Sequence, residues 1–308
     1  MDSRILGNRY RLDDVLGEGA VATVYRALDL ETGEAVAVKI PKDMDDAEDT
    51  ARLWVELRSL QRVRHPNTLR ILEMGRSGEG QHYIAMELLE GRTLRARLLS
   101  EGRLPVPAAL GILTQIFGAL DACHEHGVIH RDVKPENVIL TGQHEDTVKL
   151  IDFGMAKLLH DRSTSLLTQP HQLFGTPEYM APERITGDPP TVASDIYAAG
   201  VLGFEMLVGR RPFGGRTPEE IMRHQLRQSI PRFAELDPPV SVPRPLRGVI
   251  RRCLRKVPSQ RPSAASVLAI LFQLQGNVTD PAPEAALEVA PQASPETTQG
   301  SGDPTLEG

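Results

Sequence analysis

The first 90 residues alternate short strand-forming runs with polar turns. Residues 21–26 and 35–40 consist mainly of valine, alanine and other residues that fit a pleated surface. The glycine-containing stretch 31–34 between them is typical of a turn, and further strands are expected at 69–73 and 82–86. The pattern therefore predicts a small β-rich domain at the start of the chain.

One helical segment interrupts these strands. Residues 46–63 place apolar side chains on one face of a helix, at Leu53, Leu57 and Leu60. The small domain is expected to span residues 8–90, and the turn at Glu90-Gly91 is its predicted boundary with the next domain.

Helical periodicity dominates residues 91–275, which we interpret as a second and larger domain. Apolar residues recur at spacings of three and four between Pro105 and His126, at Leu110, Leu113, Ile116, Phe117 and Leu120. Further helices are expected at 195–208, 217–228, 245–256 and 263–274. Residues 276–308 are rich in Pro, Ala and Glu without periodicity, which predicts a disordered acidic tail.

Composition narrows the class of protein. Apolar residues make up 40% and charged residues 25% of the 308 residues, which is typical of a globular chain. Because no run reaches 18 apolar residues and no secretory segment follows Met1, we expect no membrane partner and a cytoplasmic location. Cys123 and Cys253 lie in helix-like apolar patterns, so we interpret them as buried thiols, with a disulfide as the alternative.

The net charge of −6 is unevenly distributed. Six acidic residues and no Lys or Arg occur in 276–308, so the remaining 35 basic and 35 acidic residues balance. This balance argues against nucleic acid as a partner. The strongest basic cluster alternates with apolar residues at helical spacing, so we interpret it as a solvated helix face; it comprises Arg247, Arg251, Arg252, Arg255 and Lys256.

The polar stretch 130–137 reads His-Arg-Asp-Val-Lys-Pro-Glu-Asn and lies between two short apolar runs, which can hold its side chains still at a surface. Asp132 can accept a proton from a hydroxyl group, and Asn137 can offer an oxygen to a divalent cation. Lys134 can steady a transferring phosphoryl group. A charged surface loop is the alternative for the separate residues, but the complete spacing is much rarer than its parts.

An acidic residue, Asp152, follows the apolar strand predicted around 148–151. It lies 15 residues after Asn137, and we interpret it as a second metal ligand. Phe153 is expected to pack inward and Gly154 to allow a turn. A simple turn is the alternative for this tripeptide when it occurs alone.

Two glycines and a lysine in the small domain suggest binding of a polyanion. Gly17 and Gly19 can bring backbone N–H groups close to phosphates, although a hairpin turn is the alternative. Lys39 ends the apolar run 36–38, where a strand-end charge is the alternative. Glu56 is expected near the buried side of the predicted helix, and since a buried carboxylate needs a cation, Lys39 is its predicted partner. The pair would orient Lys39 toward nucleotide phosphates.

These motifs occur in the order found in the eukaryotic-type Ser/Thr protein kinases, and from about residue 8 to 275 the chain resembles their bacterial members. The match also includes Ala181-Pro182-Glu183, Asp195 and Arg261, while Ala22 replaces the third glycine of the family's loop. The resemblance implies an α+β, bilobal protein kinase fold. Its N-lobe would be β-rich with one main helix, its C-lobe mainly α-helical, and ATP would bind between them.

The resemblance also implies site residues and cofactors. ATP and Mg²⁺ would be the cofactors, with Mn²⁺ as an alternative metal. Catalytic roles would fall to Asp132, Lys134, Lys39 and Glu56, and metal binding to Asn137 and Asp152. The remaining expected nucleotide contacts are Leu16, Gly17, Glu18, Gly19, Val24, Ala37, Met86, Glu87, Leu89 and Ile139.

The implied function is transfer of the γ-phosphate of ATP to Ser and Thr hydroxyls of proteins, within cellular signalling. Lys134 and Thr176 match positions typical of Ser/Thr rather than Tyr specificity. Two alternatives remain: a catalytically inactive scaffold of the same fold, and a small-molecule phosphotransferase. The intact Lys39, Asp132, Asn137 and Asp152 argue against the first, and the segment 175–183, suited to docking a peptide, argues against the second.

A regulatory site is expected in the polar segment 155–180. A phosphate there would give Arg131, the neighbour of Asp132, a bidentate partner. Thr168 is the predicted site of autophosphorylation, because similar bacterial kinases place a phosphothreonine seven residues before the position of Gly175. Ser163, Thr164 and Ser165 are the alternatives, and self-association would allow one copy to modify another.

Overall fold

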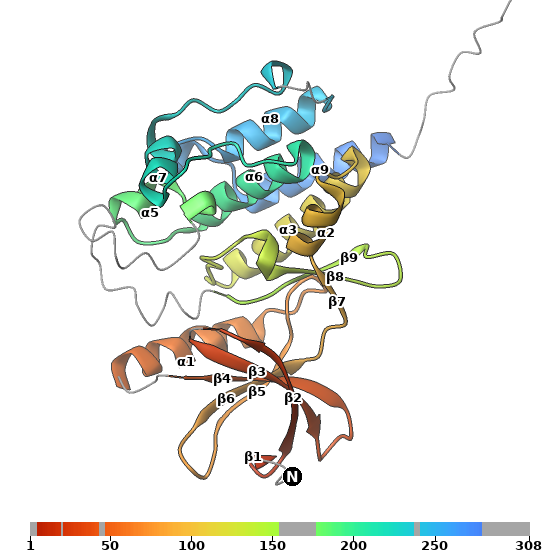
Figure 1. Cartoon of the computed structure of the whole chain (residues 1–308), viewed down its shortest axis with the longest axis vertical. Helices are drawn as coiled ribbons and strands as arrows, with labels where there is room; N and C mark the ends of the chain where they lie inside the picture. The colour runs from red at the N-terminus through yellow and green to blue at the C-terminus, as the bar shows by residue number, and fades with distance from the viewer. Residues whose placement is uncertain (1–4, 20, 43–46, 154–176, 237–240, 279–308) are drawn as a thin grey trace, which may run out of the picture.

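The computed structural model describes residues 5–19, 21–42, 47–153, 177–236 and 241–278. They form a β-rich lobe and a larger helical lobe, one above the other in Figure 1. The α+β bilobal fold expected from the sequence is therefore confirmed.

The small lobe contains a six-stranded antiparallel sheet in the order β1-β2-β3-β4-β6-β5. Its strands are β1 (Ile5–Leu6), β2 (Tyr10–Glu18), β3 (Ala22–Asp29), β4 (Ala35–Pro41), β5 (Ile71–Arg76) and β6 (His82–Glu87). The single helix α1 (Ala47–Arg62) lies beside this sheet, within two residues of the bounds that apolar periodicity predicts.

The register of the sheet places several predicted site residues on one face. Val24 pairs with Lys39, and Ala37 pairs with Met86. Residues 37 and 39 are two apart on β4, so they point to the same side, and directly paired residues share a face. The opposite face carries a separate apolar cluster that includes Val36 and Val38. One side of the sheet is therefore filled by packing, while the other side turns toward the larger lobe.

Helices make up most of the larger lobe. They are α2 (Leu94–Glu101), α3 (Val106–Glu125), α5 (Pro182–Thr186), α6 (Val192–Val208), α7 (Pro218–Arg227), α8 (Arg244–Cys253) and α9 (Ala264–Val278). Helices α3 and α6 are buried along most of their length and contact each other, and α9 packs on α3 (Figure 1). Short 3₁₀ turns at Pro135–Asn137, Pro177–Tyr179, Phe233–Glu235 and Pro258–Gln260 complete this part.

Among the described residues, α3 is long and apolar enough to cross a membrane by length and composition alone. However, 61% of its most apolar window is buried inside the fold. Helix α3 is therefore the core of the larger lobe, and its apolar character is explained by packing against α6 and α9.

A three-stranded sheet lies where the two lobes meet, in the order β7 (Gly91–Thr93), β8 (Val138–Thr141) and β9 (Thr147–Leu150). A Cβ atom at Gly91 would lie 2.1 Å from the carbonyl oxygen of Leu140, so only glycine fits this crossing. The predicted boundary at Glu90-Gly91 thus coincides with the point where the chain enters the second sheet.

Strand β9 is also held by the small lobe. The amide of Leu69 donates to the carbonyl of Leu150 over 3.1 Å, and the amide of Leu150 donates to Asn67 over 2.8 Å. The side-chain amide of Asn67 adds a bond to Val148. One buried hydrophobic cluster continues across this junction, from Leu60 and other residues of the small lobe to α3 and α6. The end of β9 is therefore fixed relative to both lobes.

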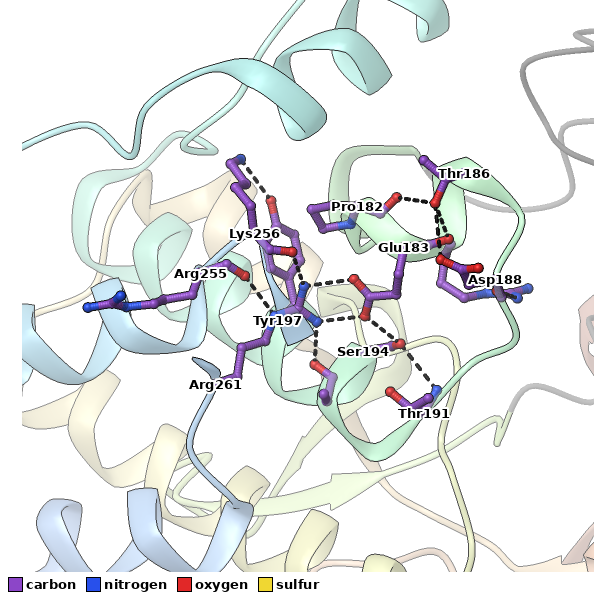
Figure 2. A network of polar contacts seen from close by, with 12 residues as sticks. Pro182, Glu183, Thr186, Asp188, Thr191, Ser194, Tyr197, Arg255, Lys256 and Arg261 are labelled. Atoms are coloured by element: carbon purple, nitrogen blue, oxygen red, sulfur yellow. Dashed lines mark hydrogen bonds and ion pairs between the residues drawn. The ribbon is translucent and has the colours of Figure 1, made fainter. Parts of the chain in front are cut away.

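A buried ion pair joins two distant segments of the larger lobe (Figure 2). Both terminal nitrogens of Arg261 donate to the carboxylate of Glu183, over 2.6 and 2.7 Å, and Ser194 donates to the same carboxylate. Burial alone would raise the pKa of Glu183, but the hydrogen bonds and the charge of Arg261, together with hydrogen bonds from the backbone and Ser194, hold that pKa below its usual range. The stabilisation is therefore present above the unfolded-state pKa and is lost as the pH falls through the folded-state value.

Lys256 lies beside this pair, and its ammonium group also makes contacts inside the fold. Its ammonium group donates to the carbonyl of Gln225 over 2.6 Å and lies 3.6 Å from the ring centroid of Phe213. Burial, together with the charge of Arg261, lowers the pKa of Lys256 to about 7. Lys256 is thus part of the packing between α7 and the segment after α8, and not part of a solvated surface.

The helix and strand predictions agree with the structure apart from their ends and a few short elements. Helix α9 continues through Gly276 to Val278, three residues past the end at residue 275 that the sequence predicts for the domain. A single glycine costs only about 1 kcal/mol in a helix, and the buried Val267 and Leu271 already hold α9 against the lobe. Strands β1, β7 and β8 and helices α2 and α5 were not predicted. The prediction for the rest of the tail concerns residues outside the described part of the chain.

Replacing Arg261 by alanine is expected to lower the free energy of unfolding by about 3–5 kcal/mol, because Glu183 would remain buried without its cation. Urea denaturation measures this loss. Arg232→Ala is the matched control: it breaks an ion pair with Glu235 whose side chains are 68% and 64% exposed, and it should cost less than about 1 kcal/mol. Equal losses in the two variants would contradict the structural role of Arg261.

Candidate active site

Asp152 and Lys39 meet where the two lobes face each other. The ammonium nitrogen of Lys39 lies 2.6 Å from the carboxylate Oδ1 of Asp152, although 113 residues separate them in sequence. The side chain of Lys39 is 11% exposed and that of Asp152 is 46% exposed. Lys39 lies within β4 and Asp152 follows β9 by two residues, so the contact links the two sheets.

The backbone at Asp152 adopts a left-handed conformation, with φ of 56°. This region is sparsely populated by residues other than glycine and costs of order 1–3 kcal/mol. The surrounding contacts of β9 hold the strain in place. Such strain turns the carboxylate away from the line of the strand and leaves it partly open to solvent.

The predicted partner of Lys39 was Glu56. The side chain of Glu56 lies outside the described part of the structure, so this pairing stays a prediction. The structure instead shows Lys39 bound to Asp152, a contact between two residues that the sequence assigns to phosphates and metal. The contact between Lys39 and Asp152 was not predicted from spacing in the sequence.

Asp195 organises the loop at 130–137. It is 1% exposed, and its carboxylate accepts hydrogen bonds from the backbone amides of His130 and Arg131, each over 2.8 Å. His124 contacts the same carboxylate at 2.9 Å. Arg131 has φ of 67°, so the loop makes a strained turn at the residue that Asp195 holds. The position of Asp195 in the first turn of α6 favours its negative charge.

His130 connects this loop to β9. The amide of Asp132 donates to Nδ1 of His130, so Nε2 carries the proton and donates to the carbonyl of Ile151 over 2.9 Å. The ring is fully buried and packs 4.5 Å from the ring centroid of Phe153. Burial lowers the pKa of His130, so the ring is neutral. His130 therefore positions Asp132 on one side and Asp152 on the other.

Three polar side chains of the loop converge. The amide nitrogen of Asn137 donates to both the backbone oxygen and the carboxylate Oδ2 of Asp132, over 2.8 and 2.9 Å. The ammonium group of Lys134 lies 2.8 Å from that same Oδ2. The predicted trio of Asp132, Lys134 and Asn137 is therefore assembled in the folded chain. A carboxylate held in this way is already oriented for the transfer of a proton.

The donor set fits a hard divalent cation. Because the amide nitrogen of Asn137 is used by Asp132, its side-chain oxygen is left as the group that a metal would bind. Asp152 supplies a partly exposed carboxylate. No group of three or more His, Cys, Asp or Glu side chains forms a metal cage among the residues that the structure describes. Two protein oxygens suit Mg²⁺ that is shared with substrate phosphates.

The expected nucleotide contacts lie along the inner face of the small-lobe sheet. Gly17 pairs with Val24, so the row Gly17, Val24 and Lys39 crosses three adjacent strands. A Cβ atom at Gly17 would meet nothing within 4 Å, which leaves room above this strand. Leu16 and Glu18 flank it and are exposed, Gly19 follows β2, and Ile139 lies in β8 of the other sheet.

Glu87 has a structural use that the sequence did not indicate. Its carboxylate accepts a bond from the amide of Arg70 and lies 2.8 Å from the ammonium group of Lys149 on β9. The amide of Glu87 donates to the carbonyl of Arg70. Glu87 therefore fastens β6 to β5 and to the second sheet, while the adjoining Leu89 lies in the connector between the lobes.

A second cluster missed by sequence reasoning surrounds Arg95 of α2. Its guanidinium binds Glu136 in the loop, Glu205 of α6 and the hydroxyl of Tyr179, over 2.8, 2.9 and 2.6 Å. Tyr179 also donates to Glu205. Burial, followed by the charge of Glu205, raises the pKa of Tyr179 well above its usual range. The cluster joins the loop to the segment 177–179, and no sequence spacing marks it.

The regulatory predictions mostly fall outside the described residues. Thr168 and Thr176 lie in the stretch 154–176, so their predicted roles stay predictions. Arg131 is described, and its backbone is fixed by Asp195.

Asp195→Asn is expected to loosen the loop, because asparagine keeps one acceptor oxygen and turns an NH2 donor toward the other of the two backbone N–H donors. Hydrogen bonds to a charged group contribute about 1.5–3 kcal/mol, so amide exchange at His130 and Arg131 should accelerate about 10- to 100-fold. Hydrogen exchange followed by mass spectrometry measures this change. Asp188→Asn, at an exposed carboxylate, is the matched control and should leave the two amides protected. Unchanged protection in Asp195→Asn would show that the loop is held by other contacts.

Comparisons with known proteins agree with this geometry. The profile of the protein kinase domain family matches residues 10–272. The chain is 41% identical over 280 residues to the Ser/Thr-protein kinase PkaA of Streptomyces coelicolor, covering 86% of this chain and 49% of that protein. It is 37% identical over 256 residues to the probable Ser/Thr-protein kinase PknB of Lactococcus lactis, covering 82% and 40%. The chain thus spans about half or less of the length of these relatives.

A solved structure shows the same fold. The crystal structure of Rad53 residues 1–466 in complex with AMP-PNP matches with a TM-score of 0.68 and 28% sequence identity, over 84% of this chain and 64% of that one. Fold, site geometry and sequence similarity therefore agree: the chain belongs to the protein kinase family and, within it, to the eukaryotic-type Ser/Thr kinases, resembling their bacterial members.

Proposed function

We propose that the chain is a Ser/Thr protein kinase that transfers the γ-phosphate of ATP to hydroxyl groups of proteins. The observation that carries this proposal is that two groups of site residues come together at the junction of the lobes. Lys39 meets Asp152 at 2.6 Å, and Asp132, Lys134 and Asn137 converge beside them through the loop that His130 and Asp195 hold. The relatives' names and the AMP-PNP complex of Rad53 support the same activity.

Binding of ATP would use the inner face of the small-lobe sheet. Val24, Ala37 and Met86 offer apolar contacts to the base from one side, and Ile139 of β8 offers one from the other lobe. The backbone near Met86 and Leu89 would contact the edge of the base. Lys39 would contact phosphate oxygens, because its buried stem directs the ammonium group into the junction between the lobes.

In the reaction, the acceptor hydroxyl attacks the γ-phosphorus as the bond to the β,γ-bridging oxygen breaks. Asp132 takes the hydroxyl proton, and Asn137 keeps the Asp132 carboxylate oriented toward the acceptor. Lys134 neutralises charge near the transferred group. Asn137 and Asp152 would hold Mg²⁺, or Mn²⁺ as the alternative, which neutralises negative charge on the phosphates when bound.

An inactive scaffold is the alternative function. It is disfavoured because the described side chains that the chemistry needs all have polar partners at the site, whereas a scaffold requires none of them; they are Lys39, Asp132, Lys134, Asn137 and Asp152. A small-molecule kinase is disfavoured because the chain's relatives are named as protein kinases.

The biological setting is part of the proposal. Protein substrates with Ser or Thr acceptors, self-association for trans-autophosphorylation, a signalling role and a cytoplasmic location all fit a protein kinase. No nucleic-acid or membrane partner is proposed. The lobes are assigned to residues 8–90 and 91–278, the second extended to the end of α9.

Asp152→Asn should lose Mg²⁺-dependent affinity for ATP, because a carboxylate ligand is removed. Calorimetric titration with and without Mg²⁺ measures this, and Asp146→Asn in the exposed β8–β9 turn is the matched control.

In parallel, Asp132→Asn should bind ATP normally but phosphorylate a peptide library about 10²- to 10⁴-fold more slowly. An Mg²⁺ dependence unchanged in Asp152→Asn would remove the metal assignment, and undiminished turnover in Asp132→Asn would remove the catalytic one.

Autophosphorylation at Thr168 is the regulatory part of the proposal, with Arg131 as the phosphate receiver. Mass spectrometry after incubation with ATP and Mg²⁺ should find this site before Ser163, Thr164 or Ser165. Thr168→Ala and Arg131→Ala should each lower activity, and the double variant should be no worse than either alone, because both changes break the same interaction. Full activity in Thr168→Ala, with no phosphate between residues 155 and 180, would end this hypothesis.

A further inference from the structure

Charge is divided sharply at the end of α9. Residues 238–278 contain seven basic residues and no acidic residue, whereas residues 279–308 contain six acidic residues and no Lys or Arg. Two of the seven cations are used inside the fold: Arg261 binds the buried Glu183, and Lys256 packs against Phe213. The other five belong to α8 and the residues directly after it: Arg244, Arg247, Arg251, Arg252 and Arg255.

Four of these arginines form a stripe along α8. Arg244, Arg247 and Arg251 follow one another at spacings of three and four, which places them along one side of α8, and Arg255 comes four residues later, two past the end of the helix. The other side is occupied by packing, since Leu246, Val249, Ile250 and Cys253 are all buried. Arg244, Arg251 and Arg255 are exposed, and Arg247 is half-buried.

No carboxylate neutralises this stripe within the part of the chain that the structure describes. Arg244, Arg247 and Arg251 make no ion pair there, and Arg255 binds only the neutral side chain of Gln260, over 3.1 Å, and no acid. Like charges at these spacings repel each other. The helix dipole favours cations at the C-terminal end of α8 but disfavours Arg244 and Arg247 at its start. A solvated face of an ordinary helix carries both signs, so a partner of opposite charge is the better explanation.

The acidic segment 279–308 matches this stripe in charge and in place. Helix α9 packs against α8 and ends at Val278 in the same lobe, so the segment begins within reach of the helix that it would cover (Figure 1). Helix α8 is about 15 Å long, and 30 residues of chain reach much farther than that. Because the two partners are tethered, their effective concentration is high, of order mM.

We propose that the acidic segment 279–308 of this chain docks on the arginine stripe Arg244–Arg247–Arg251–Arg255 of α8. The contact is made of carboxylate–guanidinium pairs at the surface, so it weakens as salt is added. It covers α8, which lies on the side of the larger lobe away from β4 and β9 (Figure 1). Docking makes the stripe unavailable to other acidic molecules.

A second arginine cluster provides a matched control. Arg58, Arg62 and Arg64 line an open hollow of about 710 Å³ between α1 and β5, together with Glu73. They are also exposed and make no ion pair among the described residues. They lie in the small lobe, far from Val278 (Figure 1), and Glu73 already places an acid in the hollow. Charge reversal there changes the net charge as much as reversal on α8.

The test follows the segment in the full chain by fluorescence anisotropy. Ser301→Cys introduces a thiol for labelling, because Cys123 and Cys253 are fully buried. Anisotropy should be high at about 0.02 M salt and fall at about 0.5 M salt. The triple variant Arg244→Glu, Arg247→Glu, Arg251→Glu should show the low value at every salt concentration. The triple variant Arg58→Glu, Arg62→Glu, Arg64→Glu should keep the salt response.

A variant with an unchanged α8 controls for the possibility that charge reversal on α8 impairs folding. Changing Glu284, Glu288 and Glu296 to glutamine should lower the anisotropy as much as charge reversal on α8 does. The response should also be unchanged over an about 100-fold dilution, because the contact is within one chain. Three results would each overturn the proposal: anisotropy that does not depend on salt, loss of the response in the α1 variant, or loss on dilution, which would place the segment on a second copy.

Discussion

A buried carboxylate in the middle of the larger lobe, that of Asp195, controls the geometry of the candidate active site. It receives the amides of His130 and Arg131, and His130 in turn donates to the carbonyl of Ile151. The next residue is Asp152, which contacts Lys39 of the small lobe. One path of hydrogen bonds therefore runs from α6 to β4. Loss of any contact along it would move two groups that the chemistry needs.

Strain and rigidity are combined at this site. Arg131 and Asp152 both have φ values in the left-handed region, where a non-glycine residue costs of order 1–3 kcal/mol. The neighbouring residues supply the opposing stability: Asp195 holds Arg131, and the pairing of β9 with both lobes holds Asp152. The apolar cluster around α3 and α6 excludes water from this frame. Strained positions therefore persist here because the surrounding structure fixes them from more than one side.

Arginine is used in two different ways in the larger lobe. Arg95 and Arg261 join segments that are far apart in sequence, and each is saturated by buried or half-buried acids. The arginines of α8 make no such pairs within the described ranges, and their charge faces solvent. The first use fixes the tertiary structure, because an unpaired buried acid is costly. The exposed arginines of α8 create a positive electrostatic potential that attracts an acidic chain.

The sequence by itself determined the order of helices and strands, the family resemblance and most of the candidate residues. Periodicity places α1, α3 and α6 almost correctly, because each buries one apolar face or its whole surface, and the spacing of 130–137 is too specific to arise from a surface loop.

Only the tertiary structure decided which charges meet. Lys39 touches Asp152 across 113 residues, Asp195 serves two amides 64 and 65 residues away, and Arg95 joins three segments. Such pairings depend on how packed elements face each other, and no local propensity encodes that. The end of α9 was also not predictable from local preference. Gly276 favours a helix end, but α9 continues to Val278 because the buried Leu271 holds the helix against the lobe.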